Sequence, residues 1–279
     1  MCTLLFVGLG GSWFVAGKLV SPQPEVIGDP PEDLPTVEIS LPSESGSTIA
    51  GWNIPADNLQ GVVVLFHGIR GSRLAMLERA RLLYDAGYSV VMIDFQAHGE
   101  SPGDTITIGH LEKHDVQATV EFAHQRYPGE PIGVIGVSLG GASSLLASPL
   151  QIDALVLESV YPNITNAVHN RVAAKLGPLS TIPAEILLLQ LKLRLGISPS
   201  ELRPADHLAD VGCPVFVISG RDDSHTTAQE TEQMFAAATD PKELWLVDDA
   251  AHEDLYEFAA TKYESQVLRF LKLHMSQQL

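Results

Sequence analysis

The feature that most constrains this chain is a serine between glycines, placed where a strand pattern ends and a helix pattern begins. Residues 132–137 form a short apolar run typical of a strand, and a run of small residues typical of a helix follows Ser138. Gly136 and Gly140 flank the serine at positions where side chains would collide in a tight strand-to-helix turn. Such a turn exposes the serine hydroxyl above a helix N-terminus, so Ser138 is predicted to be a nucleophile.

A chance match is the alternative, because G-x-S-x-G occurs by accident in chains rich in glycine and serine, and this chain has 23 glycines. The order of strand, turn and helix around the motif argues against that alternative.

Strand and helix patterns alternate along most of the chain and predict a mostly parallel sheet flanked by helices. Two strand patterns in residues 36–54 precede the alternation. Further strands are expected at residues 62–66, 89–94, 132–137, 152–157, 214–219 and 243–247, and helices at residues 73–86, 108–127, 226–238 and 254–274. Ligands are expected beyond the carboxyl ends of such strands, in one domain that spans residues 36–279.

A long insertion separates the strand at residues 152–157 from the next strand, and it is predicted to form a helical cap at about residues 160–206. Helices are expected at residues 164–176 and 183–195. The second is so rich in leucine that it must bury an apolar face, either on the main domain or as a lid over an acyl-binding pocket.

The first 20 residues form an apolar N-terminal segment whose residues 1–17 carry no charge. A membrane anchor is the favoured interpretation, and a signal sequence or an apolar helix packed on the domain are the alternatives. Five prolines in residues 21–35 indicate a semi-rigid tether. We therefore expect a membrane-anchored or membrane-associated protein, with a cytoplasmic or secreted location as the other outcomes.

The charge balance is strongly acidic, with 34 acidic and 17 basic residues and a formal net charge of −17. That charge opposes surface attraction to nucleic acid, so no nucleic-acid partner is expected. The two cysteines, Cys2 and Cys213, do not make a disulfide framework.

A serine hydroxyl needs a base, and the base needs a carboxylate that fixes its tautomer. His252 is the preferred base because it lies in a polar loop directly after the last predicted strand. Asp222 and Asp223 both follow the strand at residues 214–219 and compete for the acid role. His225, beside them, is a rival base.

In these residues the chain resembles the α/β-hydrolases, and more narrowly the Bem46-like, serine aminopeptidase S33-type hydrolases, over about residues 37–273. The resemblance is carried by His67-Gly68, the glycine-flanked Ser138, Cys213-Pro214, Gly220-x-x-Asp223 and Ala250-Ala251-His252. It implies that Asp223 is the acid, with Asp222 as the fallback. It also implies an oxyanion hole formed by the backbone N–H groups of Ile69 and Leu139, with His67 and Gly68 supporting the loop.

The predicted function is a serine hydrolase that cleaves carboxylic esters of a small molecule with an apolar acyl group, through an acyl-enzyme. No metal or organic cofactor is expected. His110 and His114 have the i, i+4 spacing of a metal pair, but no third ligand has the expected spacing. The alternatives are a peptidase or thioesterase on the same triad, or a non-catalytic tethered binding protein of the same fold.

Overall fold

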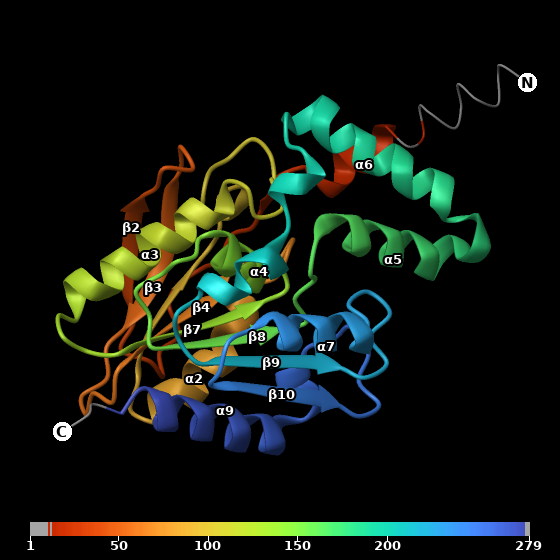
Figure 1. Ribbon diagram of the computed structural model, residues 1–279. Helices are drawn as coiled ribbons and strands as arrows, with labels where there is room; N and C mark the ends of the chain where they lie inside the picture. Colours follow the sequence, from red (N-terminus) through yellow and green to blue (C-terminus); the bar gives the residue numbers. More distant parts are fainter. Residues whose placement is uncertain (1–10, 12, 277–279) are drawn as a thin grey trace, which may run out of the picture.

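A mostly parallel sheet of eight strands forms the centre of the computed structural model, which describes residues 11 and 13–276 (Figure 1). The strand order is β10-β9-β8-β7-β4-β5-β3-β2, and β3 alone runs opposite to the other seven strands. The strands are β2 (Val37–Pro42), β3 (Thr48–Ile54), β4 (Val62–Phe66), β5 (Ser89–Ile93), β7 (Ile132–Val137), β8 (Ala154–Glu158), β9 (Val215–Gly220) and β10 (Lys242–Val247). The predicted sheet and fold class are confirmed.

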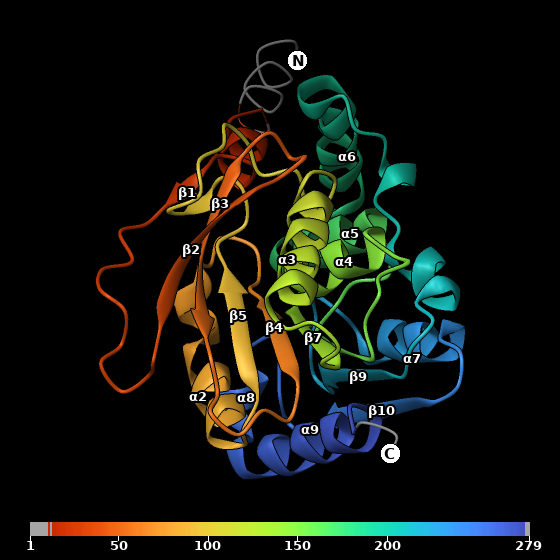
Figure 2. The ribbon, with the colours of Figure 1, turned by 90° about the vertical axis from the view of Figure 1, so that its left-hand side faces the viewer.

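Helices cover both faces of the sheet because the central strands are apolar on both sides. In β4, Val62, Val64 and Phe66 belong to one core cluster, whereas Val63 and Leu65 belong to the other. The first cluster includes side chains of α3 (Glu112–Arg126), α4 (Leu139–Leu146) and α7 (Ala228–Ala237), and the second those of α2 (Leu77–Asp85), α8 (Leu255–Phe258) and α9 (Ala260–His274). Figure 2 shows α3 and α4 on one side of the sheet and α2 on the other.

A helical cap lies beyond the carboxyl ends of the strands (Figure 1). It follows β8 and contains α5 (Ile164–Leu176), α6 (Thr181–Leu195) and two 3₁₀ segments, η2 (Gly177–Leu179) and η3 (Pro199–Glu201). A further 3₁₀ segment, η4 (Pro204–Asp210), packs against α4 and α7 of the main domain. Leu188 and Leu191 of α6 are buried in the main core, whereas Leu189 and Leu193 are exposed. The leucine-rich helix therefore buries only part of its apolar surface.

Several predicted helix boundaries were wrong. The helix expected at residues 73–86 begins as a 3₁₀ turn, η1 (Arg73–Met76), before α2. The helix expected at residues 108–127 begins at Glu112. The single closing helix expected at residues 254–274 is divided at Ala259, whose backbone angles of −135° and 41° are not helical.

Most of the predicted anchor, residues 1–10 and 12, lies outside the described residues. Residues 13–19 are helical and lie along α6, where the Arg194 guanidinium is 3.7 Å from the centre of the Trp13 ring. The proline-rich segment also contacts the domain. Its β1 (Gln23–Pro24) pairs with β6 (His98–Gly99), and Ile27 and Leu34 are buried. No helix of residues 13–276 has both the length and the apolar character needed to cross a membrane.

A buried polar network joins α2 to the end of β8, the start of α8 and the side of α9. The Arg79 guanidinium is 2% exposed and donates to both carboxylate oxygens of Glu158, at 3.1 and 2.7 Å, and to both of Asp254, at 2.9 Å each. The Tyr263 hydroxyl donates to the Glu158 carboxylate. Asp254 also accepts the N–H groups of Tyr256 and Glu257 and thereby begins α8. Every charge in the network has a partner.

We expect Arg79→Met to lower the free energy of unfolding by about 3–5 kcal/mol, because it leaves a buried Glu158 carboxylate without its cation. Urea denaturation at neutral pH measures this change. Arg81→Gln on the same helix is the control, since Arg81 and its partners Glu78 and Asp33 are far more exposed, and it should have a much smaller effect. Equal stability of the two variants would contradict the structural importance of the network.

Candidate active site

Ser138 occupies a strained turn between β7 and α4. Its φ of 48° and ψ of −104° lie outside the regions usual for a side-chain-bearing residue, and its N–H donates to the Glu158 carbonyl at 2.8 Å. The flanking glycines are sterically required. A Cβ at Gly136 would lie 2.5 Å from the Gly141 nitrogen, and one at Gly140 would lie 2.3 Å from the Phe66 oxygen. The backbone thus holds the serine at the tip of the turn.

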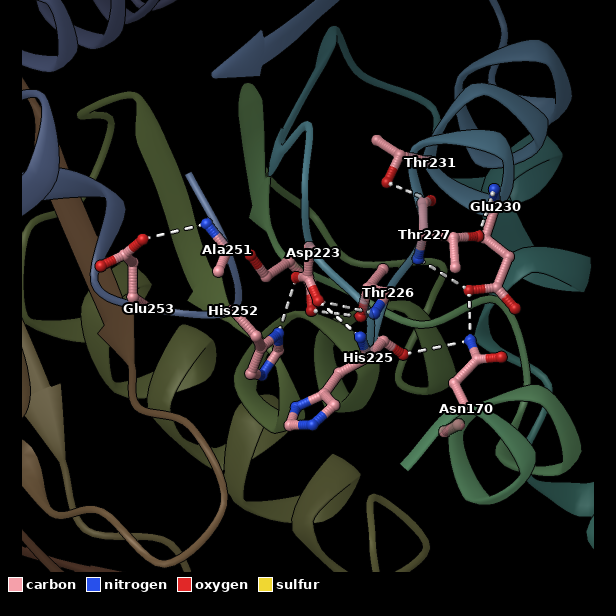
Figure 3. A network of polar contacts seen from close by, with 12 residues as sticks. Asn170, Asp223, His225, Thr226, Thr227, Glu230, Thr231, Ala251, His252 and Glu253 are labelled. Carbon is pink, nitrogen blue, oxygen red and sulfur yellow. Dashed lines mark hydrogen bonds and ion pairs between the residues drawn. The ribbon is translucent and has the colours of Figure 1, made fainter. Parts of the chain in front are cut away.

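His252 and Asp223 meet across the loops that follow β10 and β9 (Figure 3). The Nδ1 atom of His252 lies 2.7 Å from Oδ2 of Asp223. Oδ1 of Asp223 accepts the N–H groups of His225, at 2.7 Å, and Thr226, at 2.9 Å. Burial would raise the pKa of the Asp223 carboxyl, but His252 and the two backbone donors hold this pKa below its usual value. Asp223 is therefore poised as a carboxylate toward His252.

Asp222, the alternative acid, and His225, the alternative base, do not form the corresponding contacts. The Asp222 side chain is exposed, and the backbone N–H of Asp222 donates to the Ala250 carbonyl at 2.9 Å. The His225 ring packs beside the His252 ring with 4.8 Å between centroids, and burial and the nearby Arg171 charge lower its pKa. Neither side chain takes the place of the Asp223–His252 pair.

Gly220 lets the two loops come together. A Cβ there would lie 2.4 Å from the carbonyl oxygens of both Ala250 and Ala251. Any side chain at this position would push the His252 loop away from the Asp223 loop.

Two adjoining cavities include Ser138. The more open one, of about 260 Å³, is lined by Ser138, His252, Gly68 and Ile69, among others. The smaller one, of about 150 Å³, is lined by Ser138, Leu139, Ile69 and largely apolar cap residues. The structure therefore brings together at one end of the sheet the residues proposed as nucleophile, base and oxyanion-hole donors.

His67 braces the loop that carries Gly68 and Ile69. Its Nδ1 lies 2.7 Å from the Gly68 oxygen, and its Nε2 accepts the Phe95 N–H at 3.1 Å, so the ring is neutral with its proton on Nδ1. Burial, with a smaller effect of His98, lowers the pKa of His67 to about 3. A neutral ring with both nitrogens bonded fixes the loop to the end of β5.

The histidines considered as a metal pair have separate neighbours. His110 lies 3.7 Å from Glu201, and His114 lies 3.7 Å from Glu44. Across the described part of the chain, no group of three or more His, Cys, Asp or Glu side chains could hold a metal ion.

Sequence reasoning did not identify Glu158, Arg171 or Tyr161 as parts of the site. Glu158 supports Ser138 through its carbonyl, and the other two line the smaller Ser138 cavity. No pattern in the sequence singles out Arg171, because α5 also carries asparagine, histidine and lysine side chains.

Known proteins that resemble this chain in sequence or in structure indicate a hydrolase. Residues 57–192 match the family model described as serine aminopeptidase, S33. The chain is 24% identical over 245 residues to the uncharacterized protein YqkD of Bacillus subtilis, covering 86% of this chain and 80% of that one. It is 26% identical over 259 residues to the uncharacterized protein YfhR of Escherichia coli O157:H7, covering 90% and 84%.

Among solved structures, an esterase of Pyrococcus furiosus, Pf2001, superposes with a TM-score of 0.76 at 26% identity, covering 92% of this chain and 99% of that one. The α/β-hydrolase GrgF of a Penicillium species has a TM-score of 0.69 at 18% identity, covering 87% and 99%, and shows likeness of fold.

The sheet order, the strained serine turn and the loops that gather at the carboxyl ends of the strands define a hydrolase enzyme whose structure resembles esterases. The chain has the α/β-hydrolase fold, and the match over residues 57–192 confirms the resemblance to the serine aminopeptidase S33-type hydrolases.

The buried neutral His67 predicts a pH-dependent stability. Because its pKa falls from about 6.5 in the unfolded chain to about 3 when folded, the unfolded state binds the extra proton first. The free energy of unfolding therefore has its full value above about pH 6.5. Protonation of His67 in the unfolded state lowers it by about 1.4 kcal/mol for each pH unit between roughly pH 6 and pH 4.

Urea denaturation of wild type and His67→Gln at several pH values between 7 and 4.5 measures this dependence, which should be shallower in the variant. His169→Gln is the control, since that ring is one-third exposed. Parallel curves for wild type and His67→Gln would show that the ring is not held neutral.

Proposed function

We propose that the protein is a serine hydrolase that cleaves carboxylic esters through an acyl-enzyme, with Ser138, His252 and Asp223 as its triad. The observation that carries the proposal is the 2.7 Å contact between His252 and a buried Asp223 carboxylate, made beside a cavity that His252 shares with the strained Ser138. This arrangement supplies a nucleophile, a base and a group that orients the base.

In the proposed reaction, His252 Nε2 accepts the Ser138 proton as Oγ attacks the ester carbonyl. The Asp223 carboxylate keeps the other ring proton on Nδ1 and stabilises the imidazolium that forms. The N–H groups of Ile69 and Leu139 are proposed to bind the tetrahedral oxyanion, with α4 adding the partial positive charge of its N-terminus.

Collapse of that intermediate breaks the ester C–O bond, and His252 returns the proton to the departing alcohol. A water molecule deprotonated by His252 then attacks the acyl-enzyme. The bond between the acyl carbon and Ser138 Oγ breaks, His252 returns the proton to Oγ, and the acid is released. No step of this sequence requires a metal or an organic cofactor.

The proposed substrate is a small ester with an apolar acyl group. Next to the Ser138 cavity lies a larger one of about 440 Å³ between the N-terminal helix and the cap, and the two share Leu19, Val168 and Arg171. Its other lining residues are mostly apolar, as an acyl chain requires. The likeness to the Pf2001 esterase supports ester cleavage in particular.

Peptide cleavage is the second candidate, because the matching family model is named for an aminopeptidase. It would use the same three residues, and comparison of p-nitrophenyl esters with aminoacyl p-nitroanilides separates the two activities. A tethered binding protein of this fold would not react with a fluorophosphonate probe.

We expect Ser138→Ala to lower kcat/KM for p-nitrophenyl butyrate at least about 10³-fold, because both the nucleophile and the covalent intermediate are lost. Labelling by a fluorophosphonate probe should disappear with it. Ser224→Ala is the matched control, since Ser224 is exposed in the Asp223 loop. Full ester turnover by the Ser138→Ala protein would rule out the proposed mechanism.

Val168 lines both the Ser138 cavity and the larger cap cavity, so a bulkier side chain there should obstruct an acyl chain. We expect Val168→Trp to lower the ratio of kcat/KM for p-nitrophenyl decanoate to that for p-nitrophenyl acetate about ten-fold or more. Leu189→Trp, on the exposed face of α6, serves as the control. An unchanged ratio in the Val168 variant would place the acyl chain elsewhere.

A further inference from the structure

Two arginines at the Ser138 cavity differ from the other eight in their partners. Among the described residues, six arginines form ion pairs with carboxylates, and two lie over an aromatic ring without an ion pair. The six are Arg73, Arg79, Arg81, Arg203, Arg221 and Arg269, and the two are Arg126 and Arg194. The remaining two, Arg70 and Arg171, both line the smaller Ser138 cavity.

Arg171 projects from cap helix α5 and is half-buried. Its Nη1 donates to the Ala167 carbonyl of its own helix at 3.1 Å, and no carboxylate of the described residues lies within ion-pair distance. Burial lowers the pKa of the guanidinium, with Tyr161, Asp223 and Glu230 opposing this effect from farther away. The side chain remains a cation, because the ordinary pKa of arginine is far above neutral.

Arg70 approaches the same cavity from the loop after β4. Its Nη1 donates to the Lys18 carbonyl at 2.9 Å, and its Nη2 donates to the Gln23 side-chain oxygen. Both acceptors are neutral, so its positive charge is also uncompensated by a carboxylate. The φ of 62° at Arg70 shows that the backbone adopts an unfavourable left-handed conformation at this point.

The surroundings make an uncompensated cation costly. The rest of the smaller cavity is lined mainly by apolar side chains, among them Leu19, Ile108 and Ile164. A cation partly removed from water at such a site is stabilised when an anion is bound beside it. The planar guanidinium fork fits the paired oxygens of a carboxylate or a phosphate.

We infer that the substrate carries an anionic carboxylate or phosphate group, which Arg171 and Arg70 bind while the ester carbonyl lies at Ser138. This inference rests on the proposed function and specifies its substrate class further. The chain as a whole has a net charge of −17, so attraction of an anion must be local to this cavity.

The anionic group can belong to either half of the ester. An acid with a second carboxylate would place it in the acyl part, whereas an alcohol bearing a carboxylate or phosphate would place it in the leaving group. Arg171 also lines the larger cap cavity, so an apolar chain has space beyond the anion in either case.

Two pairs of esters distinguish these sources. For the acyl side, p-nitrophenyl hydrogen glutarate is compared with its neutral methyl ester. For the alcohol side, 4-acetoxybenzoate is compared with its methyl ester. We expect wild type to have at least a ten-fold higher kcat/KM for the anionic member of one pair. Equal kcat/KM values within both pairs, or preference for the neutral member of both, would overturn the inference.

Substitutions of Arg171 test whether this residue causes the preference for the anionic ester. Arg171→Gln should lower the ratio of anionic to neutral kcat/KM at least ten-fold, and Arg171→Lys should lower it less, because it keeps the charge but loses the fork. Arg126→Gln, an arginine stacked on Tyr127, is the control and should keep the wild-type ratio. An unchanged ratio in Arg171→Gln would overturn the assignment.

A binding measurement separates this inference from the proposed function. Calorimetry on Ser138→Ala compares monomethyl glutarate with dimethyl glutarate, without any need for turnover. The monoanion should bind at least ten-fold more tightly, and Arg171→Gln in the same background should remove the difference. If no ester is hydrolysed by wild type, ester hydrolysis fails, yet this binding difference still supports the anion site. Equal affinities overturn the anion site whatever the reaction.

Discussion

The site depends on Glu158, the last residue of β8, because this one residue joins the serine turn to the histidine loop. Its carbonyl accepts the Ser138 N–H, and its buried carboxylate holds Arg79 and the Tyr263 hydroxyl. Arg79 in turn binds Asp254, two residues beyond His252. The buried network therefore fixes the geometry between the serine turn and the loop of its proposed base, although its members come from four separate parts of the chain.

The fold could be predicted from local patterns because each central strand is apolar on both faces and each motif follows a strand. In a parallel sheet the carboxyl ends of the strands meet at one edge, so Ser138, Asp223 and His252 were expected to converge once their strands were recognised. The choice of Asp223 over Asp222 required the family resemblance, since both carboxylates follow the same strand. In the structure, the Asp223 side chain is buried against His252 and the Asp222 side chain is exposed.

Other parts could not be predicted because they depend on contacts between distant residues. Arg79 and Tyr263 lie in amphipathic helices and carry no motif, so their buried network was not visible in the sequence. The break at Ala259 separates α8, which Asp254 begins, from α9, and no glycine or proline marks it. The proline-rich segment was predicted as a tether from its composition, but composition carries no information about the β6 edge with which β1 pairs.

The loop after β4 has three roles that the proposals connect. His67 fixes it to the end of β5, Ile69 lines the cavity as a proposed oxyanion donor, and Arg70 presents an uncompensated charge to the same cavity. Residues 69 and 70 are adjacent, so an anion bound by Arg70 would also restrain the position of the Ile69 N–H. Recognition of the substrate charge and stabilisation of the transition state would then depend on one short segment. The neutral, fully bonded His67 is the group that keeps that segment rigid.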